Sequence, residues 1–142
     1  MPTRILVRMW HPWRVLRDRL DITLIWTDDL SDGVLGATDG ARICMPLHQL
    51  QAEWRCTLTD ELIHIEPGHR GCQPPAIEAE VSHRSGSALH PLNGLVRTVV
   101  WAASPEELAD ELWVDLNMLF IRLDTCTDRE RRVVNASLAR KD

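Results

Sequence analysis

The sequence contains no tyrosine and a single phenylalanine, so its aromatic side chains are almost all tryptophan. It has no run of about 18 apolar residues, the least that a membrane-spanning helix needs. The apolar stretch Ile5 to Val7 is interrupted by Arg4 and Arg8, and no small-residue cleavage site follows it. We therefore expect a chain that spans no membrane and stays in the cytoplasm.

The sequence also has no CxxC pair and no excess of positive charge. Its four irregularly spaced cysteines favour reduced, inert thiols over a disulfide framework: Cys44, Cys56, Cys72 and Cys126. The formal net charge of −5 argues against general nucleic-acid binding, which depends on clustered Lys and Arg. With 142 residues and no biased tract, the chain is predicted to form one domain over residues 1–142.

Residues 21–47 have the pattern of β-strands. Ile22, Leu24 and Trp26 alternate with polar residues. The dipeptide Asp39-Gly40 separates two short apolar segments and predicts a type I′ hairpin of residues 34–38 and 41–45. We expect the strand over 41–45 to lie at a sheet edge, where it could hold a substrate in an extended form.

From Trp54 onward the apolar period becomes helical, and Pro67-Gly68 ends that helix. Pro75 predicts the start of a second helix that reaches Leu89, and residues 92–103 suggest a third. Capping residues predict three more helix starts, at Ser104 with Glu107, at Asp115, and at Thr127 with Glu130.

The segment Asp60-Glu61-Leu62-Ile63-His64 has the pattern DExxH on a predicted helix. Residues 60 and 64 are one turn apart, so both side chains could reach one metal ion. Glu61 stands where HExxH peptidases keep the carboxylate that takes a proton from the metal-bound water. A solvated helix face is the simpler alternative.

Several motifs occur in one order along most of the chain: His11-Pro12-Trp13, the arm over residues 33–38, Gln51-Ala52-Glu53, the DELIH helix, Gly68-His69, residues 73–78, residues 88–92 and residues 107–115. With these motifs the chain resembles the ImmA/IrrE family of zinc metallo-endopeptidases, in particular its short phage and actinobacterial forms. The first zinc histidine of that family is replaced here by Asp60.

The resemblance implies a hydrolase site in which Asp60, His64 and Glu78 bind Zn²⁺ and Glu61 is the general base. Glu80 is the alternative third ligand, because Glu78 and Glu80 lie about 200° apart on a helix and cannot both face the metal. An oxygen-rich ligand set shifts the preference toward harder ions such as Mn²⁺ or Mg²⁺, and we expect Asp60 to weaken or abolish metal binding and proteolysis. His69 lies beyond the helix break and is not expected to replace the missing ligand.

The resemblance also implies a protein partner, namely a helix-turn-helix repressor of a phage or mobile element that the protein would cleave. The alternative is a pseudoprotease that binds a repressor or another protein without cutting it. The C-terminal helices around residues 105–123 themselves resemble a helix-turn-helix, but their acidic character makes DNA binding an unfavoured function. If exposed, Trp113, Met118 and Phe120 would suit a protein partner, although core packing is expected for at least two of them.

The predicted fold class is α+β, with a small antiparallel sheet packed on metallopeptidase-type helices. Residues 1–103 would hold the sheet and the metal-site helices, and residues 104–142 the helix-turn-helix-like segment. Five tryptophans are expected to be core anchors: Trp10, Trp13, Trp26, Trp54 and Trp101.

Overall fold

The computed structural model describes residues 10–31, 33–71 and 73–140, and within these residues it contains a three-stranded sheet and seven helices. The α+β fold class is therefore confirmed. The elements in chain order are α1 (Pro12–Asp18), β1 (Thr23–Trp26), β2 (Ala37–Thr38), β3 (Arg42–Met45), α2 (Gln51–Ile65), α3 (Pro75–Leu89), α4 (Leu92–Val99), α5 (Pro105–Leu112), α6 (Leu116–Asp124) and α7 (Asp128–Ala139).

The sheet is mixed, so the purely antiparallel sheet expected from the sequence is wrong. The strand order is β1-β3-β2, with β3 antiparallel to β2 and parallel to β1. After β1 the chain travels through residues 27–36 before the hairpin, and β3 then enters between the other two strands. Because β3 is central, the expectation of an edge strand over residues 41–45 is also wrong, and β2 lies at the edge instead.

The hairpin exists, but its loop is shifted by one residue from the prediction. Thr38 pairs with Ile43, and the Asp39 N–H donates to the Arg42 carbonyl at 3.3 Å, so the two-residue loop is Gly40-Ala41. Gly40 has a φ of 96°, whereas Asp39 does not have the positive φ that a type I′ turn on Asp39-Gly40 requires. The Asp39 carboxylate instead accepts from the N–H groups of Ala41 and Arg42.

The predicted helix starts of the C-terminal third are confirmed by their caps. Ser104 accepts from the Glu107 N–H, Asp115 accepts from the Met118 N–H, and Thr127 and Glu130 form a complete capping box. Helix α2 begins three residues before Trp54, at Gln51, and α4 ends at Val99 rather than at residue 103. Helix α1 was not anticipated from the sequence.

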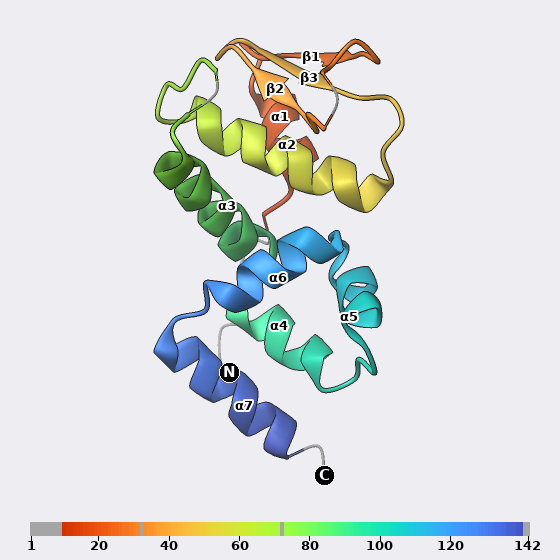
Figure 1. Cartoon of the computed structure of the whole chain (residues 1–142), viewed down its shortest axis with the longest axis vertical. Helices are drawn as coiled ribbons and strands as arrows, with labels where there is room; N and C mark the ends of the chain where they lie inside the picture. Colours follow the sequence, from red (N-terminus) through yellow and green to blue (C-terminus); the bar gives the residue numbers. More distant parts are fainter. Residues whose placement is uncertain (1–9, 32, 72, 141–142) are drawn as a thin grey trace, which may run out of the picture.

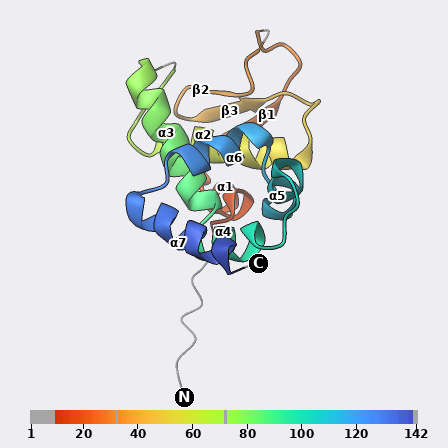
Figure 2. The ribbon, with the colours of Figure 1, turned by 60° about the horizontal axis from the view of Figure 1, so that its bottom comes forward.

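Two hydrophobic clusters lie on different faces of α2, which joins the two ends of the molecule. Figure 1 shows the sheet at one end, α2 beneath it, and α4 to α7 at the other end; Figure 2 shows the same arrangement from another side. The first cluster joins the sheet to α2 through Ile43, Met45, Leu58 and other residues. The second includes Cys56 of α2 and residues of α3, α5 and α6.

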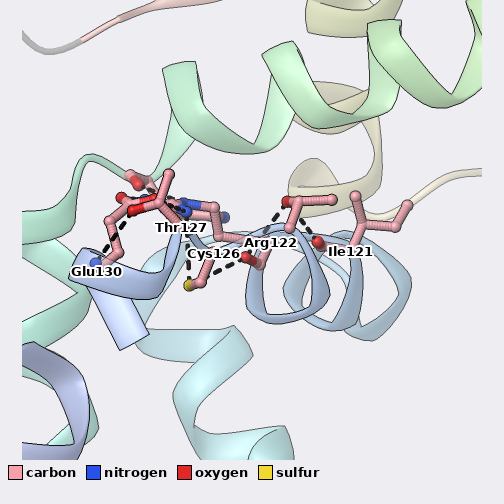
Figure 3. A network of polar contacts seen from close by, with 7 residues as sticks. Ile121, Arg122, Cys126, Thr127 and Glu130 are labelled. Carbon is pink, nitrogen blue, oxygen red and sulfur yellow. Dashed lines mark hydrogen bonds and ion pairs between the residues drawn. The ribbon is translucent and has the colours of Figure 1, made fainter. Parts of the chain in front are cut away.

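A buried arginine fastens α6 to α3 and α7. Arg122 is 2% exposed, its Nε donates to the His90 carbonyl at 2.9 Å, and its guanidinium pairs with Glu130. Figure 3 shows this network, in which Cys126 also contacts Arg122. Gly86 of α3 lies beside this arginine, and a Cβ there would be in ordinary van der Waals contact with the Arg122 side chain at 3.5 Å.

The tryptophans do not behave as a set of core anchors. Trp101 is 82% exposed and Trp26 is 39% exposed, so the expectation is wrong for these two. Of the three candidate partner residues, Trp113 and Phe120 are exposed and only Met118 is buried, so the expected core packing of two is also wrong. No helix of the described ranges is long and apolar enough to cross a membrane.

Candidate functional site

Helices α2 and α3 bring two of the predicted ligands into direct contact. The Nε2 atom of His64 and the Oε2 atom of Glu78 are 3.0 Å apart, although the residues are 14 positions apart in the chain. Helix α3 begins at Pro75, so Glu78 lies in its first turn, and its other oxygen accepts from the Gln73 N–H at 3.0 Å. His64 is buried, whereas the Glu78 side chain is 45% exposed. The pair therefore places a buried imidazole in contact with a carboxylate that reaches the surface.

His69 joins this pair, which the sequence reasoning did not anticipate. Its Nδ1 lies 3.1 Å from the Nδ1 of His64, and which nitrogen donates depends on the tautomers. The cause is the end of α2. Gly68 has a φ of 85°, its N–H donates to the Ile65 carbonyl, and the His69 N–H donates to the His64 carbonyl. This is a Schellman motif, which places the residue after the glycine beside the residue five positions earlier.

Asp60 and Glu61 face a different space, a cleft of about 300 Å³ that also borders the arm over residues 33–36 and Ser82 of α3. Neither His64 nor Glu78 lines this cleft. The Oδ1 atom of Asp60 is buried and has no hydrogen-bond partner among the described residues. Glu61 likewise makes no hydrogen bond within the described part of the chain. Asp60 and Glu61 thus both line one cleft, and neither the buried Oδ1 of Asp60 nor the Glu61 carboxyl group has a hydrogen-bond partner among the described residues.

The burial of these two carboxyl groups changes their acidity. Burial raises the pKa of Asp60 to about 6, and the Ser85 hydroxyl opposes that rise while the charges of Asp115 and Glu78 add to it. Burial also raises the pKa of Glu61 to about 7, with further contributions from Asp60 and Glu78. A carboxyl group with a pKa near neutrality can both accept and return a proton, as a general base requires.

The arm over residues 33–36 lies directly against the predicted base. A Cβ on Gly36 would lie 2.5 Å from Cγ2 of Thr57 and 3.3 Å from Oε1 of Glu61. Only a glycine therefore lets the backbone pass this close to α2. The arm leads into β2, one of the two edge strands of the described sheet, so this edge of the sheet begins near Glu61.

The alternative ligand Glu80 lies away from this region. Its side chain is exposed and borders a separate surface hollow with Glu66, His83 and Arg84. Glu78 rather than Glu80 is thus the glutamate that meets His64.

Zinc is the ion that the resemblance implies, and the predicted ligands do not form one donor set for it in this arrangement. Both ring nitrogens of His64 are engaged, Nε2 with Glu78 and Nδ1 with His69. Asp60 lines the separate cleft instead. Among the described residues, no group of three or more His, Cys, Asp or Glu side chains is placed to hold a metal ion. The mismatch lies at Asp60, whose side chain is shorter than that of histidine.

No family model, curated protein or solved structure matches the chain. Membership of the ImmA/IrrE family therefore remains a prediction from the sequence motifs.

Proposed function

We propose that this chain is a cytoplasmic, metallopeptidase-like protein that binds a protein partner without cleaving it efficiently. The observation that carries the proposal is the division of the predicted site. His64 of α2 and Glu78 of α3 contact each other directly, whereas Asp60 lines the cleft that contains Glu61. A catalytic zinc needs about three protein ligands and an open position for water.

The chemistry of Asp60 supports reduced catalysis independently of its position. Its carboxylate is shorter than an imidazole, so a shared ion would have to move toward α2. Two carboxylates and one imidazole also place more negative charge around the ion than two imidazoles and one carboxylate. An ion held by such a ligand set would acidify its bound water less, so peptide hydrolysis would be slower.

The edge of the sheet supports binding of an extended protein segment. β2 is an edge strand of the sheet that the described residues form, and the Gly36 arm leads from this strand to the cleft of Glu61. An added strand would gain backbone hydrogen bonds there. The resemblance suggests the partner, a helix-turn-helix repressor of a phage or mobile element.

A working zinc metallo-endopeptidase is the second candidate function. It is favoured by the contact between His64 and Glu78, which unites two predicted ligands from different helices, with Glu61 three residues before His64. In this alternative, Asp60, His64 and Glu78 would hold the metal, and Glu61 would act as general base.

Zinc content and zinc affinity distinguish the two functions. We would measure both, by elemental analysis and calorimetry, for the natural chain, Asp60→His and the control Asp60→His/His64→Ala. Binding without efficient cleavage predicts a natural chain that binds zinc at least about tenfold more weakly than Asp60→His, with the gain lost in the control. Stoichiometric zinc in the natural chain, lost on His64→Ala, together with cleavage of labelled casein that Glu61→Gln abolishes, would establish the peptidase instead.

Partner binding needs its own measurement. Calorimetry with the helix-turn-helix repressor encoded nearest to this chain should show binding that survives chelator and Glu61→Gln. Binding that disappears with chelator would contradict a metal-independent interaction.

A further inference from the structure

A hollow lined largely by aromatic side chains lies away from the Asp60 and Glu61 cleft, where α1, β1, α2 and α5 meet. It is a pocket of about 620 Å³, within the range of roughly 300 to 1,000 Å³ that small-molecule sites occupy. Its walls include the tryptophans Trp13, Trp26, Trp54 and Trp113. Four indole rings from four separate elements thus line one pocket.

Three of these rings form a connected wall. Trp13 and Trp26 stack with ring centroids 6.2 Å apart, and Trp54 meets Trp26 edge-on at 4.8 Å. Trp54 is fixed by donating to the Pro46 carbonyl at 3.1 Å. The indole N–H groups of Trp13, Trp26 and Trp113 donate no hydrogen bond among the described residues. The wall therefore offers flat apolar surface together with unused donors.

Arg55 places a positive charge at the same pocket. Its Nη1 donates to the carbonyls of Leu112 and Trp113 at 3.1 Å each. In the described part of the chain its Nε and Nη2 donate no hydrogen bond, and no carboxylate lies within ion-pair distance. Both carbonyls lie at the C-terminal end of α5, so Arg55 caps that helix, while its guanidinium has no carboxylate partner among the described residues. Burial lowers the pKa of Arg55, in keeping with a charge that lacks a compensating anion.

Trp113 has a left-handed backbone conformation, which glycine adopts far more often than other residues. It ends α5 with a φ of 57° and a ψ of 47°, and it is the only described non-glycine residue with positive φ. Its side chain is nonetheless 69% exposed at the pocket. A large apolar ring in a strained backbone conformation, exposed to solvent, gains little for folding. Its exposed ring at the pocket is accessible to a ligand.

The other charged groups narrow the class of ligand. Asp110 also borders the pocket, but it is exposed and makes no ion pair with Arg55. Asp110 would repel a second negative charge on the ligand, so a ligand with a single negative charge is preferred. The first turn of α2, Gln51 and Ala52, adds the positive end of a fifteen-residue helix to the pocket.

We propose that this pocket binds a small organic monoacid with a flat, apolar body, which packs between the tryptophans while its carboxylate pairs with Arg55. Arg55 has a planar fork of donors that matches a carboxylate. The indole rings supply stacking surface for the body of the ligand. This site is independent of the α2–α3 pair and of the function proposed for it.

The test is calorimetry on the full chain with three probes that share one ring system: naphthylacetate, the neutral naphthylacetamide and the cationic naphthylmethylamine. The acid should bind at least about tenfold more tightly than the amide, and the amine should bind most weakly. Equal affinity for acid and amide, preference for the amine, or no binding of any probe would overturn the proposal.

Two kinds of variant locate the site. Trp113→Gly should weaken the acid by about tenfold while the protein keeps its melting temperature or gains a little. Arg55→Gln should remove the preference for acid over amide, and Arg55→Lys should retain part of it. Arg55 also donates hydrogen bonds to the end of α5, so Arg55→Gln could prevent folding. In that case the affinity of Trp113→Gly for the acid tests whether the ligand binds in this pocket. Unchanged affinity in Trp113→Gly would place any binding elsewhere.

Discussion

Arg122 of α6 and Glu130 of α7 form an ion pair whose two members differ in exposure, since the Arg122 side chain is 2% exposed and that of Glu130 is 20% exposed. Glu130 also closes the capping box of α7 by accepting from the Thr127 N–H. The hydrogen bond from Arg122 holds the pKa of Glu130 at about 2. The Glu130 carboxylate thus neutralises the buried charge of Arg122 and also caps the N-terminus of α7.

Glu130→Gln should lower the free energy of unfolding by about 3 kcal/mol, because it leaves the guanidinium of Arg122 buried without a counter-charge. Denaturant unfolding at neutral pH measures this. The matched control is Glu66→Gln, whose partner Arg84 is exposed, and it should change stability by less than about 1 kcal/mol. The stabilisation from Glu130 is complete above its unfolded pKa of 4.5 and is lost as the pH falls toward 2. Equal effects of the two substitutions would contradict this account.

The parts of the fold that short sequence patterns encode were predicted correctly. Ser104, Asp115 and Thr127 each cap a helix through a residue three positions later, so the signal is complete within four residues. Pro75 likewise marks the start of α3 because its missing N–H and fixed φ suit the first turn.

The errors concern arrangements set by distant residues. Nothing in residues 41–45 says that β1 will pair with them in parallel, because that choice depends on how the sheet packs on α2. His69 is a different kind of miss. Gly68 supplied a local signal for a Schellman motif, and that motif returns His69 to His64. The meeting of His64 with Glu78 was expected from the resemblance, whereas the separate cleft of Asp60 was not.

The raised pKa of Glu61 predicts how stability depends on pH in the metal-free protein. A carboxyl group whose pKa is higher in the folded state stabilises the fold below its unfolded pKa of 4.5. That stabilisation is lost as the pH rises through about 7. Glu61→Gln removes the charge, so at pH about 8 it should stabilise the chain by on the order of 2 kcal/mol. Thermal unfolding in chelator at acidic and alkaline pH measures the effect, with the more exposed Glu66→Gln as control. A natural chain whose stability does not fall toward alkaline pH would show that Glu61 is not desolvated.

The close approach of Gly36 to Thr57 predicts a rescue by a second substitution. Gly36→Ala would place a methyl group 2.5 Å from Cγ2 of Thr57, so it should destabilise the protein by about 1 to 3 kcal/mol. Thr57→Ser removes that methyl group and keeps the hydroxyl near Gln49. The double variant should therefore recover more than half of the loss, measured by denaturant unfolding as a double-mutant cycle. Additive effects of the two substitutions would show that the arm moves away from α2 instead of clashing with it.

The backbone of Trp113 predicts that glycine is the more stable residue at the end of α5. A left-handed conformation costs a residue with a Cβ about 1 to 2 kcal/mol, and glycine adopts it without that cost. The indole is 69% exposed, so its removal sacrifices little buried surface. Trp113→Gly should then raise the free energy of unfolding by about 1 kcal/mol. Trp113→Ala is the matched control, because it removes the same ring but keeps the Cβ, and it should be less stable than the glycine variant. If alanine and glycine were equally stable, the backbone at residue 113 would not be strained, and the case for a functional role of the exposed ring would lose its energetic basis.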